Sequence, residues 1–349
     1  MNKTPLVSLL LLNWNGIEFT RKCIRSLLKT NYPNFEIILV DNGSRDNEGE
    51  RLISEFGKMV KIILQPVNIG YAEGMNIAYR RAIGDYIMLL NNDMEFTSDW
   101  LLPLVRILQK NPFVGACQPK IKDVKNKNIF EYAAAAGGFI DFFGYPFARG
   151  RVFSKVEIDT GQYENQIKIC WAGVLLIRRS ILKKIGLFDP IYFNYAEDVD
   201  LCLRIYSQGY LIVYIPNSIV YHFGGGVLNK NLFQKMYFIH RNHLILIVKN
   251  WEAKKLLFFF PLRLSMEFIS FFYYLLTGYP MSALSVIKAL LSVLFMTKRI
   301  LLSRFKYKKY LNSNNLSNMP MYKGSIVWDY FILRKQKFSS IMKSDMHGP

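Results

Sequence analysis

The chain has 349 residues, a mass of 40.7 kDa and a formal net charge of +19 at pH 7. Hydrophobic residues make up 51% and aromatic residues 15% of it, which excludes intrinsic disorder for most of the chain and allows a sizeable core. The four cysteines, Cys23, Cys117, Cys170 and Cys202, form no CxxC pair, which argues against a disulfide scaffold and a cysteine-based zinc finger.

The first ninety residues alternate between strand-like and helix-like segments. Apolar runs predict buried strands at 6–13, 35–40, 60–64 and 86–90, and helical spacing of apolar residues predicts helices at 18–29 and 72–82. This rhythm predicts an α/β fold, a Rossmann-like, mostly parallel sheet with helices on both faces. The first run is short and lacks a small-residue cleavage site, so we interpret it as a strand rather than a signal peptide.

Polar clusters follow three of these expected strands at the point where each strand ends. They are Asn13-Trp14-Asn15, the segment 41–46 that begins with Asp41, and Asn91-Asn92-Asp93. Ligands of parallel sheets bind beyond the carboxyl ends of the strands. An ordinary loop explains any one cluster equally well, but three in register predict a single site.

The middle of the chain, 112–168, shows no clean period. Two interpretations stay open for this segment: a mobile lobe that faces the acceptor molecule of a reaction, or a plain irregular loop. Regular patterns return from residue 169. We expect a strand at 170–177, a helix at 197–207 with acidic residues near its start, short strands at 211–215 and 219–221, and His222 directly after the last strand.

The C-terminal third has a different composition. Residues 249–349 carry 16 Lys/Arg and 4 Asp/Glu, a net charge of +12 against +7 for the rest. The apolar segment 256–297 holds three charges: Arg263, Glu267 and Lys288. Its uncharged part, 268–287, is broken by Gly278 and Pro280, and basic residues follow it. The pattern favours interfacial or re-entrant membrane helices; a spanning segment and a soluble helical subdomain or dimer surface are the alternatives.

Acidic and imidazole side chains recur at the ends of the expected elements: Asp41, Asp93, the Glu197-Asp198 pair and His222. Singly, each is explained by helix capping or by a structural role. Together, Asp93 and His222 would leave most of a divalent cation's coordination sphere open to a nucleotide diphosphate. A carboxylate free of metal, such as Asp198, could take a proton from an incoming hydroxyl. These parts suit metal-assisted transfer of a group from a nucleotide diphosphate to an alcohol.

The chain resembles family 2 glycosyltransferases of the GT-A fold, particularly the branch that contains rhamnosyltransferases. The resemblance covers residues 6–226. Seven segments carry it in order: VSLLLLNWNG (7–16), IILVDNGSRD (37–46), NIGYAEGMNIA (68–78), YIMLLNND (86–93), WAGVLLIRRSILKKIGLFD (171–189), YAEDVDLCLR (195–204) and VYHFGG (220–225).

The resemblance implies roles for residues at the matching positions. The nucleotide and donor side would comprise Asp41 at the base, Asn13 and Asn15 in the same pocket, and Asn68, Gly70, Gly74, Asn76, Asn91 and Asn92. Asn91-Asn92-Asp93 replaces the DxD motif, and Asn91 departs from its first aspartate. Asp93 and His222 would lie on the metal side with Mg²⁺ or Mn²⁺. Asp198 would be the general base, and Glu197 would orient the acceptor or the base.

Trp171 and Gly173 have two interpretations. Aromatic faces pack on sugar C–H groups, so these residues could shape the sugar or acceptor pocket, whereas packing in the core is the simpler explanation.

The resemblance implies an inverting, metal-dependent glycosyltransferase that uses dTDP-rhamnose or a UDP-sugar and a lipid-linked or cell-surface glycan acceptor. We expect a catalytic domain at 1–230, a membrane-associating helical region at 231–337 and a flexible tail at 338–349. The expected location is the cytoplasmic face of the cell membrane, on an anionic lipid surface, without nucleic acid as a partner. The alternative function is a non-catalytic relative that binds nucleotide sugars or acts as a scaffold.

Overall fold

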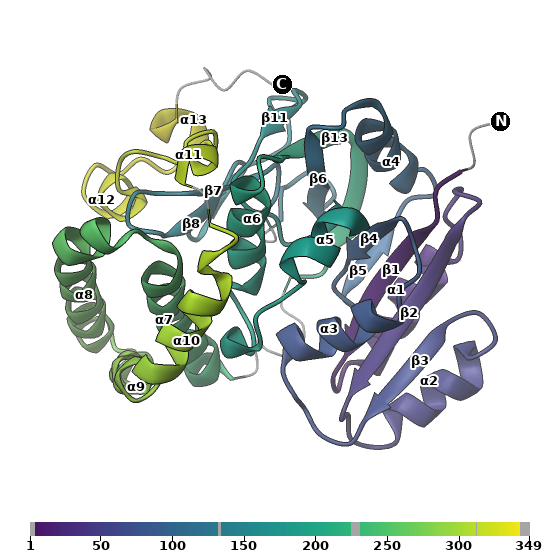
Figure 1. Cartoon of the computed structure of the whole chain (residues 1–349), viewed down its shortest axis with the longest axis horizontal. Helices are drawn as coiled ribbons and strands as arrows, with labels where there is room; N and C mark the ends of the chain where they lie inside the picture. Colours follow the sequence, from purple (N-terminus) through teal and green to yellow (C-terminus); the bar gives the residue numbers. More distant parts are fainter. Residues whose placement is uncertain (1–3, 132–133, 225–230, 312, 343–349) are drawn as a thin grey trace.

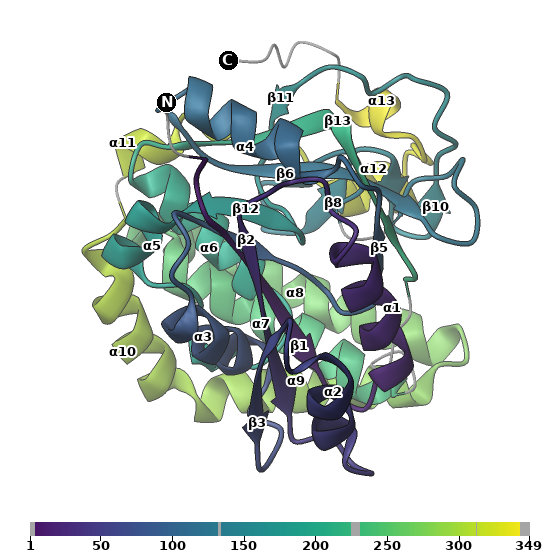
Figure 2. The ribbon, with the colours of Figure 1, turned by 90° about the vertical axis from the view of Figure 1, so that its right-hand side faces the viewer.

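The computed structural model describes residues 4–131, 134–224, 231–311 and 313–342. A nine-stranded mixed sheet forms its centre, with the strand order β11-β13-β6-β12-β4-β1-β2-β3 and with β5 paired to β13 (Figures 1 and 2). The strands are β1 (Val7–Asn13), β2 (Phe35–Asn42), β3 (Lys61–Gln65), β4 (Tyr86–Leu89), β5 (Met94–Phe96), β6 (Val114–Asp123), β11 (Ile167–Lys168), β12 (Leu175–Arg178) and β13 (Leu211–His222).

Helices cover both faces of this sheet, as the sequence predicts. They are α1 (Ile17–Leu27), α2 (Glu48–Phe56), α3 (Tyr71–Arg81), α4 (Leu101–Lys110), α5 (Arg179–Ile185) and α6 (Glu197–Ser207), and the 3-10 helix η1 (Pro190–Tyr192) precedes α6. Successive residues of β1 enter opposite cores: Leu10 packs on the side of α3 and α6, whereas Leu9 and Leu11 pack on the side of α1 and α4. A strand buried on both faces must be apolar throughout, which explains the unbroken run in the sequence.

The parallel part of the sheet matches the sequence prediction closely. Strands β3, β2, β1 and β4 run parallel in register, so their carboxyl ends lie at one edge. The other half differs from the expectation. The strand expected from residue 170 begins at Leu175, and the two short strands expected after α6 form one strand, β13, with a register shift between Ile215 and Ile219. Pro216 lies at that shift, where it need not donate to the ladder.

The segment 112–168 is more ordered than its irregular pattern indicates. It begins with the central strand β6 and continues into a small antiparallel sheet. The small sheet is β7 (Gly138–Ile140), β8 (Pro146–Ala148), β9 (Arg151–Val152) and β10 (Lys155–Val156). Strands of two or three residues are too short to show a period, so the sequence pattern could not reveal them.

The C-terminal region is a group of helices beside the nine-stranded sheet (Figure 1). The helices are α7 (Leu232–Asn250), α8 (Ala253–Leu276), α9 (Pro280–Phe295), α10 (Thr297–Lys308), α11 (Ser313–Leu316), α12 (Ile326–Phe331) and α13 (Phe338–Ile341). The apolar segment breaks between α8 and α9 at Gly278, whose φ is +81°, and Pro280, as predicted. Phe338 and Ile341 of α13 are buried, so this part of the expected flexible tail is packed, while 343–349 lie outside the described residues.

By length and composition, one helix among the described residues, α8, is apolar enough to cross a membrane. The pair α9 and α10 passes the same test only together, and it is bent by 66°. Two charged side chains in the middle of α8 are turned inward: Arg263 and Glu267 are buried and pair with each other, and Glu267 also contacts His240 of α7 at 2.5 Å. Helix α8 is therefore attached to the rest of the protein along a polar stripe.

Candidate active site

Asp41, near the end of β2, lies beside the end of β1. Its Oδ1 accepts a hydrogen bond from Asn13 Nδ2 at 2.7 Å, and its Oδ2 accepts one from the backbone N–H of Ser44 at 3.2 Å. Thr20 Oγ1 donates to Asn13 at 2.7 Å and accepts from Asn92 Nδ2 at 2.8 Å. One chain of hydrogen bonds therefore joins the ends of β1 and β2 to the segment after β4.

Asn15 holds the two loops that border Asp41. Its backbone has a φ of +51°, its N–H donates to Ser44 Oγ at 3.0 Å, and its Oδ1 accepts from the backbone N–H of Arg45 at 2.8 Å. The left-handed conformation is one that asparagine tolerates better than most residues. Asn15 thus shapes the wall of the predicted nucleotide pocket.

Asn68 and Gly70 lie where the chain enters α3. Asn68 Oδ1 accepts from Asn42 Nδ2 at 3.0 Å and from the backbone N–H of Gly70 at 2.9 Å. Gly70 has a φ of +88°, and a Cβ there would meet the Phe193 ring at 2.6 Å. Glycine is required here because this segment touches the loop that leads into α6.

Gly74 and Asn76 fix α3 against its neighbours. A Cβ on Gly74 would lie 2.2 Å from Leu12 of β1. The Asn76 side chain accepts from the backbone N–H of Phe188 at 3.0 Å and donates to the Phe188 carbonyl at 3.1 Å. The structure gives both residues packing roles, and the donor contacts implied by the family resemblance stay predictions.

Asp93 and His222 meet at the second part of the site. His222 Nε2 lies 3.0 Å from Asp93 Oδ1, and its Nδ1 lies 2.7 Å from Glu131 Oε2. Asn91 Nδ2 lies 3.4 Å from the same Nε2. Burial alone would lower the pKa of His222, but the Asp93 and Glu131 carboxylates outweigh it and raise the pKa to about 10. The ring therefore adds positive charge beside Asp93.

The residues at Asp93 fit a divalent cation only in part. Within the described ranges, no three His, Cys, Asp or Glu side chains are arranged to hold a metal ion by themselves. One carboxylate and one imidazole suit Mg²⁺ or Mn²⁺ when substrate phosphate oxygens and water complete the coordination sphere. Neighbouring ligands of an octahedral ion at about 2.1 Å lie about 3 Å apart, so the 3.0 Å between His222 Nε2 and Asp93 Oδ1 suits a shared cation once Nε2 has lost its proton.

Glu197 and Asp198 begin α6. Burial, and then the adjacent Asp198 charge, hold the pKa of Glu197 well above its usual range. Burial raises the pKa of Asp198 to about 6, although its Oδ1 accepts the backbone N–H of Val199 at 2.8 Å. Glu197 is buried and Asp198 is partly exposed. Glu197 is therefore the harder of the two to ionise, and the partly exposed Asp198 is the better candidate for a base.

Tyr71, at the start of α3, lies within electrostatic range of both the Glu197-Asp198 pair and Asp93. Burial raises the pKa of its phenol, and the charges of Glu197, Asp198 and Asp93 raise it further. The adjacent pair Glu197-Asp198 and the distant Asp93 therefore act on a single hydroxyl. The shared site expected from the sequence stays a prediction.

The loop before Glu197 is strained and is held by α7. Phe193, Tyr195 and Ala196 have φ values of +62°, +69° and +68°, and such conformations cost non-glycine residues about 1–3 kcal/mol each. Asn242 Nδ2 donates to the carbonyls of Tyr192, Asn194 and Tyr195 at 2.6 to 2.8 Å. Helix α7 thus stabilises the conformation that presents the acidic pair.

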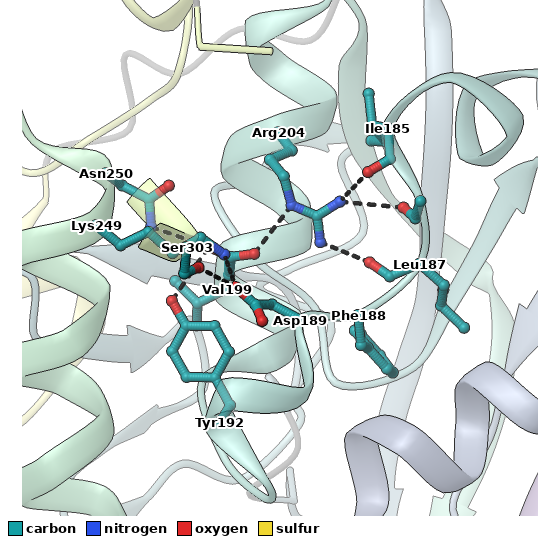
Figure 3. A network of polar contacts seen from close by, with 12 residues as sticks. Ile185, Leu187, Phe188, Asp189, Tyr192, Val199, Arg204, Lys249, Asn250 and Ser303 are labelled. Carbon is teal, nitrogen blue, oxygen red and sulfur yellow. Dashed lines mark hydrogen bonds and ion pairs between the residues drawn. The ribbon is translucent and has the colours of Figure 1, made fainter. Parts of the chain in front are cut away.

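A buried ionic network holds the segment 185–189, which leads into that loop (Figure 3). Lys249 of α7 contacts Asp189 at 2.7 Å and Asp200 of α6 at 2.9 Å. Arg204 pairs with Asp200 at 2.9 Å and donates to the carbonyls of Ile185, Gly186 and Leu187. Ser303 of α10 also contacts Asp189. The C-terminal helices are therefore part of the scaffold of the site.

The structure places Trp171 in a packing role. Its indole N–H donates to the carbonyls of Phe139 at 2.9 Å and Phe147 at 3.2 Å, and its ring would collide with a Cβ on Gly138. Gly173 lies two residues further on and is half-buried. These contacts favour the simpler interpretation for Trp171, and a sugar contact by either residue stays a prediction.

Several residues of the site escaped the sequence analysis. Glu131 lies in the segment without a period, and Asn242 lies in the middle of a helix, so no local pattern marks either one. Tyr71 and Thr20 lie next to predicted motifs but look like ordinary helix residues. Only contacts between distant segments identify these four.

The family model described as glycosyl transferase family 2 matches residues 8–186, half of the chain. The chain belongs to glycosyl transferase family 2. It is 26% identical to the rhamnosyltransferase WbbL of Escherichia coli over 178 residues, 49% of this chain and 67% of that protein. It is also 26% identical to the N-acetylglucosaminyl-diphospho-decaprenol L-rhamnosyltransferase of Mycobacterium tuberculosis, over 53% of this chain and 66% of that protein. The predicted resemblance to the rhamnosyltransferase branch is confirmed.

Other relatives are much longer than this chain. The O-antigen biosynthesis protein RfbC of Myxococcus xanthus is 30% identical over 63% of this chain, which spans 17% of that protein. The chain spans 25% of the uncharacterized protein y4gI of Sinorhizobium fredii.

Two solved structures share the fold at low identity, which confirms the predicted GT-A-like architecture. GalNAc-T7, with UDP, GalNAc and Mn²⁺, has a TM-score of 0.57 and 18% identity, covering 74% of this chain and 50% of that chain. The mannosyltransferase PcManGT of Pyrobaculum calidifontis, with GDP-Man and Mn²⁺, has a TM-score of 0.50 and 16% identity, covering 88% of this chain and 84% of that chain.

Proposed function

We propose that this protein transfers a sugar from a nucleotide-diphosphate donor to a hydroxyl of a glycan acceptor, with inversion at the anomeric carbon. The observation that carries the proposal is the acidic pair at the start of α6. Burial raises the pKa of both carboxyls, Asp198 is the more exposed of the two, and both lie near enough to Tyr71 to raise the pKa of its phenol, as Asp93 does. A glycosyl transfer by direct displacement needs one base near the diphosphate site.

Asp198 is the base in this proposal. Its Oδ1 is occupied by the N–H of Val199, and its Oδ2 has no hydrogen-bond partner within the described part of the chain. That oxygen takes the proton of the acceptor hydroxyl as the acceptor oxygen attacks the anomeric carbon from the face opposite the diphosphate. The bond between the sugar and the donor diphosphate breaks in the same step.

Asp93 and His222 hold the diphosphate end of the donor. His222 would be the second protein ligand of the cation, which requires its Nε2 to be unprotonated. Mg²⁺ or Mn²⁺ bound at Asp93 would neutralise the negative charge that develops on the leaving diphosphate. The two Mn²⁺-containing structures with a similar fold support this choice of ion.

The nucleoside lies against Asp41, Asn13 and Asn15, and Asn68 and Gly70 border the sugar. Asp41 is buried and directed toward the loops after β1 and β2, a suitable acceptor for a base N–H. We propose dTDP-rhamnose as the donor, with UDP-sugars as the alternative, because two of the similar proteins are named rhamnosyltransferases.

The acceptor in this proposal is a lipid-linked or cell-surface glycan. The name of the mycobacterial relative states a diphospho-decaprenol acceptor, and another relative is named for O-antigen biosynthesis. The protein would act on the cytoplasmic face of the cell membrane, where nucleotide sugars are made.

An anionic membrane surface is the proposed partner of α8, α9 and α10. These helices expose many large apolar side chains, among them Phe258, Leu276 and Phe295, which are 73%, 87% and 83% exposed. Contiguous exposed apolar surface marks an interaction site, and the basic residues of 298–309 lie beside it. This combination favours lipid over nucleic acid.

A thermal-shift screen of nucleotide sugars with Mg²⁺ or Mn²⁺ tests the proposal, followed by product analysis with the sugar that stabilises the protein most. We expect stabilisation by a thymidine or uridine diphosphate sugar and slow donor hydrolysis that requires the cation. Donor binding without hydrolysis or transfer would support the non-catalytic alternative instead.

A further inference from the structure

A groove of about 650 Å³ lies between α7 and α9, outside the site described above. Its volume is within the roughly 300–1,000 Å³ of clefts that bind small ligands. Phe233 and Tyr237 line it from α7, and Leu284, Lys288, Leu291 and Phe295 line it from α9. We call it the α7–α9 groove.

The α7–α9 groove has an apolar wall and one charged side chain. Lys288 Nζ lies 5.3 Å from the ring of Phe233 and 4.9 Å from that of Tyr237. No carboxylate in the described ranges pairs with Lys288, which is exposed. An exposed ammonium beside an otherwise apolar groove is complementary to a ligand with a hydrocarbon chain and an anionic end.

Further positive charge lies beside the groove. The guanidinium of Arg241 lies 5.3 Å from the Tyr237 ring. Burial lowers the pKa of Arg241, and after the raising effect of Tyr237 the charge of Arg299 lowers it again, so a second cation of α10 is near. Arg241 is itself buried and donates to the Tyr192 carbonyl, so Lys288 is the cation that is exposed to a ligand of the groove.

The groove is connected to the candidate active site by two stacked rings. Phe238, next to Tyr237, stacks on Phe193 with a centroid distance of 5.3 Å and an interplanar angle of 16°. Phe193 contacts Gly70 on the donor side and lies four residues before Glu197. Helix α7 therefore supplies one wall of the groove and, one residue further on, a ring that packs on the loop before the acidic pair.

The outer edge of the groove is continuous with the apolar surface of the C-terminal helices. Leu284, Leu291 and Phe295 line the groove and are also half or more exposed, on the helix that packs against α8 and α10. A hydrocarbon chain could thus pass from a bilayer into the groove without crossing water.

We propose that the α7–α9 groove binds the hydrocarbon chain of a lipid-linked acceptor, and that Lys288 contacts the phosphate that joins this chain to the glycan. The proposal rests on the proposed function, because it assigns the acceptor of that same reaction. It specifies an isoprenoid or other long-chain diphosphate rather than a soluble glycan.

Titration calorimetry with farnesyl diphosphate tests the groove. The full chain is kept in neutral detergent, micelles alone serve as the blank, and saturating dTDP or UDP with Mg²⁺ blocks the donor site. We expect farnesyl diphosphate to bind about tenfold or more tightly than either pyrophosphate or farnesol, since only the first has both chain and charge. Equal binding of all three would overturn the proposal.

Matched variants locate the binding. Lys288→Gln and Leu291→Gln, which change groove residues, are expected to weaken farnesyl diphosphate binding about tenfold. Lys110→Gln and Phe113→Gln change exposed residues at the end of α4 and just after it, outside the groove and the membrane-facing helices, and should leave it unchanged. Equal weakening in all four variants, or a dimer that covers the groove and dissociates with Leu291→Gln, would overturn the proposal.

Nucleotide-sugar binding is measured separately for the unmodified chain and for each of the four variants. If the unmodified chain binds farnesyl diphosphate but no nucleotide sugar, the proposed function fails and the groove stands. If it binds nucleotide sugar but farnesyl diphosphate no better than pyrophosphate, the groove assignment fails alone.

Discussion

Glu197 and Asp198 are adjacent in the sequence but occupy different surroundings. Glu197 is buried, and its Oε2 has no partner in the described part of the chain, whereas Asp198 is partly exposed. Removal of a general base lowers rates by ~10²–10⁴. We therefore expect Asp198→Asn to lose sugar transfer by that factor while nucleotide binding, measured by calorimetry, is kept. Near-normal turnover of this variant would show that another group is the base.

The raised pKa of Asp198 predicts the acidic limb of the pH profile. Asp198 acts as a base only when ionised, and burial raises its pKa to about 6. The value of kcat/KM should therefore fall about tenfold for each pH unit below 6, since it follows the ionised fraction of the free enzyme. A profile that stays flat down to pH 4.5 would contradict the assignment.

Asp93 is the residue on which cation-dependent donor binding depends. Asp93→Ala removes the carboxylate beside His222, so we expect nucleotide diphosphate to bind more weakly and to lose its response to Mg²⁺ or Mn²⁺. Calorimetry with and without the cation measures both. Asp99→Ala, at an exposed position before α4, is the control. Unchanged cation dependence in Asp93→Ala would refute the metal role.

At the scale of elements, α7 and α10 determine the conformation of the segment 186–196. Lys249 is fully buried between two carboxylates, Asp189 and Asp200. Burial alone would raise the pKa of Asp200, but Lys249 and Arg204 outweigh it and lower the pKa to about 2. The loop that carries the acidic pair is therefore fixed by charges from helices that lie outside the family match.

Lys249→Met tests this dependence. Removing one partner of a buried ion pair costs about 3–5 kcal/mol, because the carboxylates left behind are uncompensated. We expect a loss of that order in the free energy of unfolding, measured in urea. Lys306→Met, on the exposed side of α10, should change it by less than about 0.5 kcal/mol. Equal small losses in both variants would show that the network is dispensable.

At the scale of the whole molecule, the C-terminal helices lie at the opposite end from α4 (Figure 1). Their outer surface is apolar, while their inner surface carries Arg263 and Glu267 paired within the protein. If α8 left this position to span a bilayer, the Arg263–Glu267 pair would lose its contact with His240 and enter the hydrocarbon layer. The arrangement therefore favours helices that lie on the membrane over a helix that crosses it.

Sedimentation with vesicles of phosphatidylglycerol and phosphatidylcholine tests the whole-molecule prediction. We expect the full chain to bind, and less strongly at high salt, because the basic residues contribute through screened attraction. Leu257→Glu with Phe258→Glu should release it, whereas Phe113→Glu, an equally exposed apolar position near α4, should not. A gel shift with nucleic acid and no vesicle binding would contradict the choice of partner.

The sequence by itself determined the parallel half of the sheet and the residues at its edge. Leu9, Leu10 and Leu11 are buried between two cores, so a continuous apolar run marked β1. Asp41 and the segment Asn91-Asn92-Asp93 came at the ends of the expected strands. Helix α6 was predicted with its observed bounds, because its acidic start and apolar spacing are local signals. Family resemblance added the expected roles.

Only the tertiary structure decided what surrounds those residues. Three contacts join segments separated by tens of residues: that of His222 with Glu131, the hydrogen bonds of Asn242 to the loop before Glu197, and the ion pair of the buried Lys249 with Asp189. Burial and partner charge depend on the packing of distant segments, and no local pattern encodes them. The same reason applies to α8, whose composition suits a membrane span while its packing turns both charges inward.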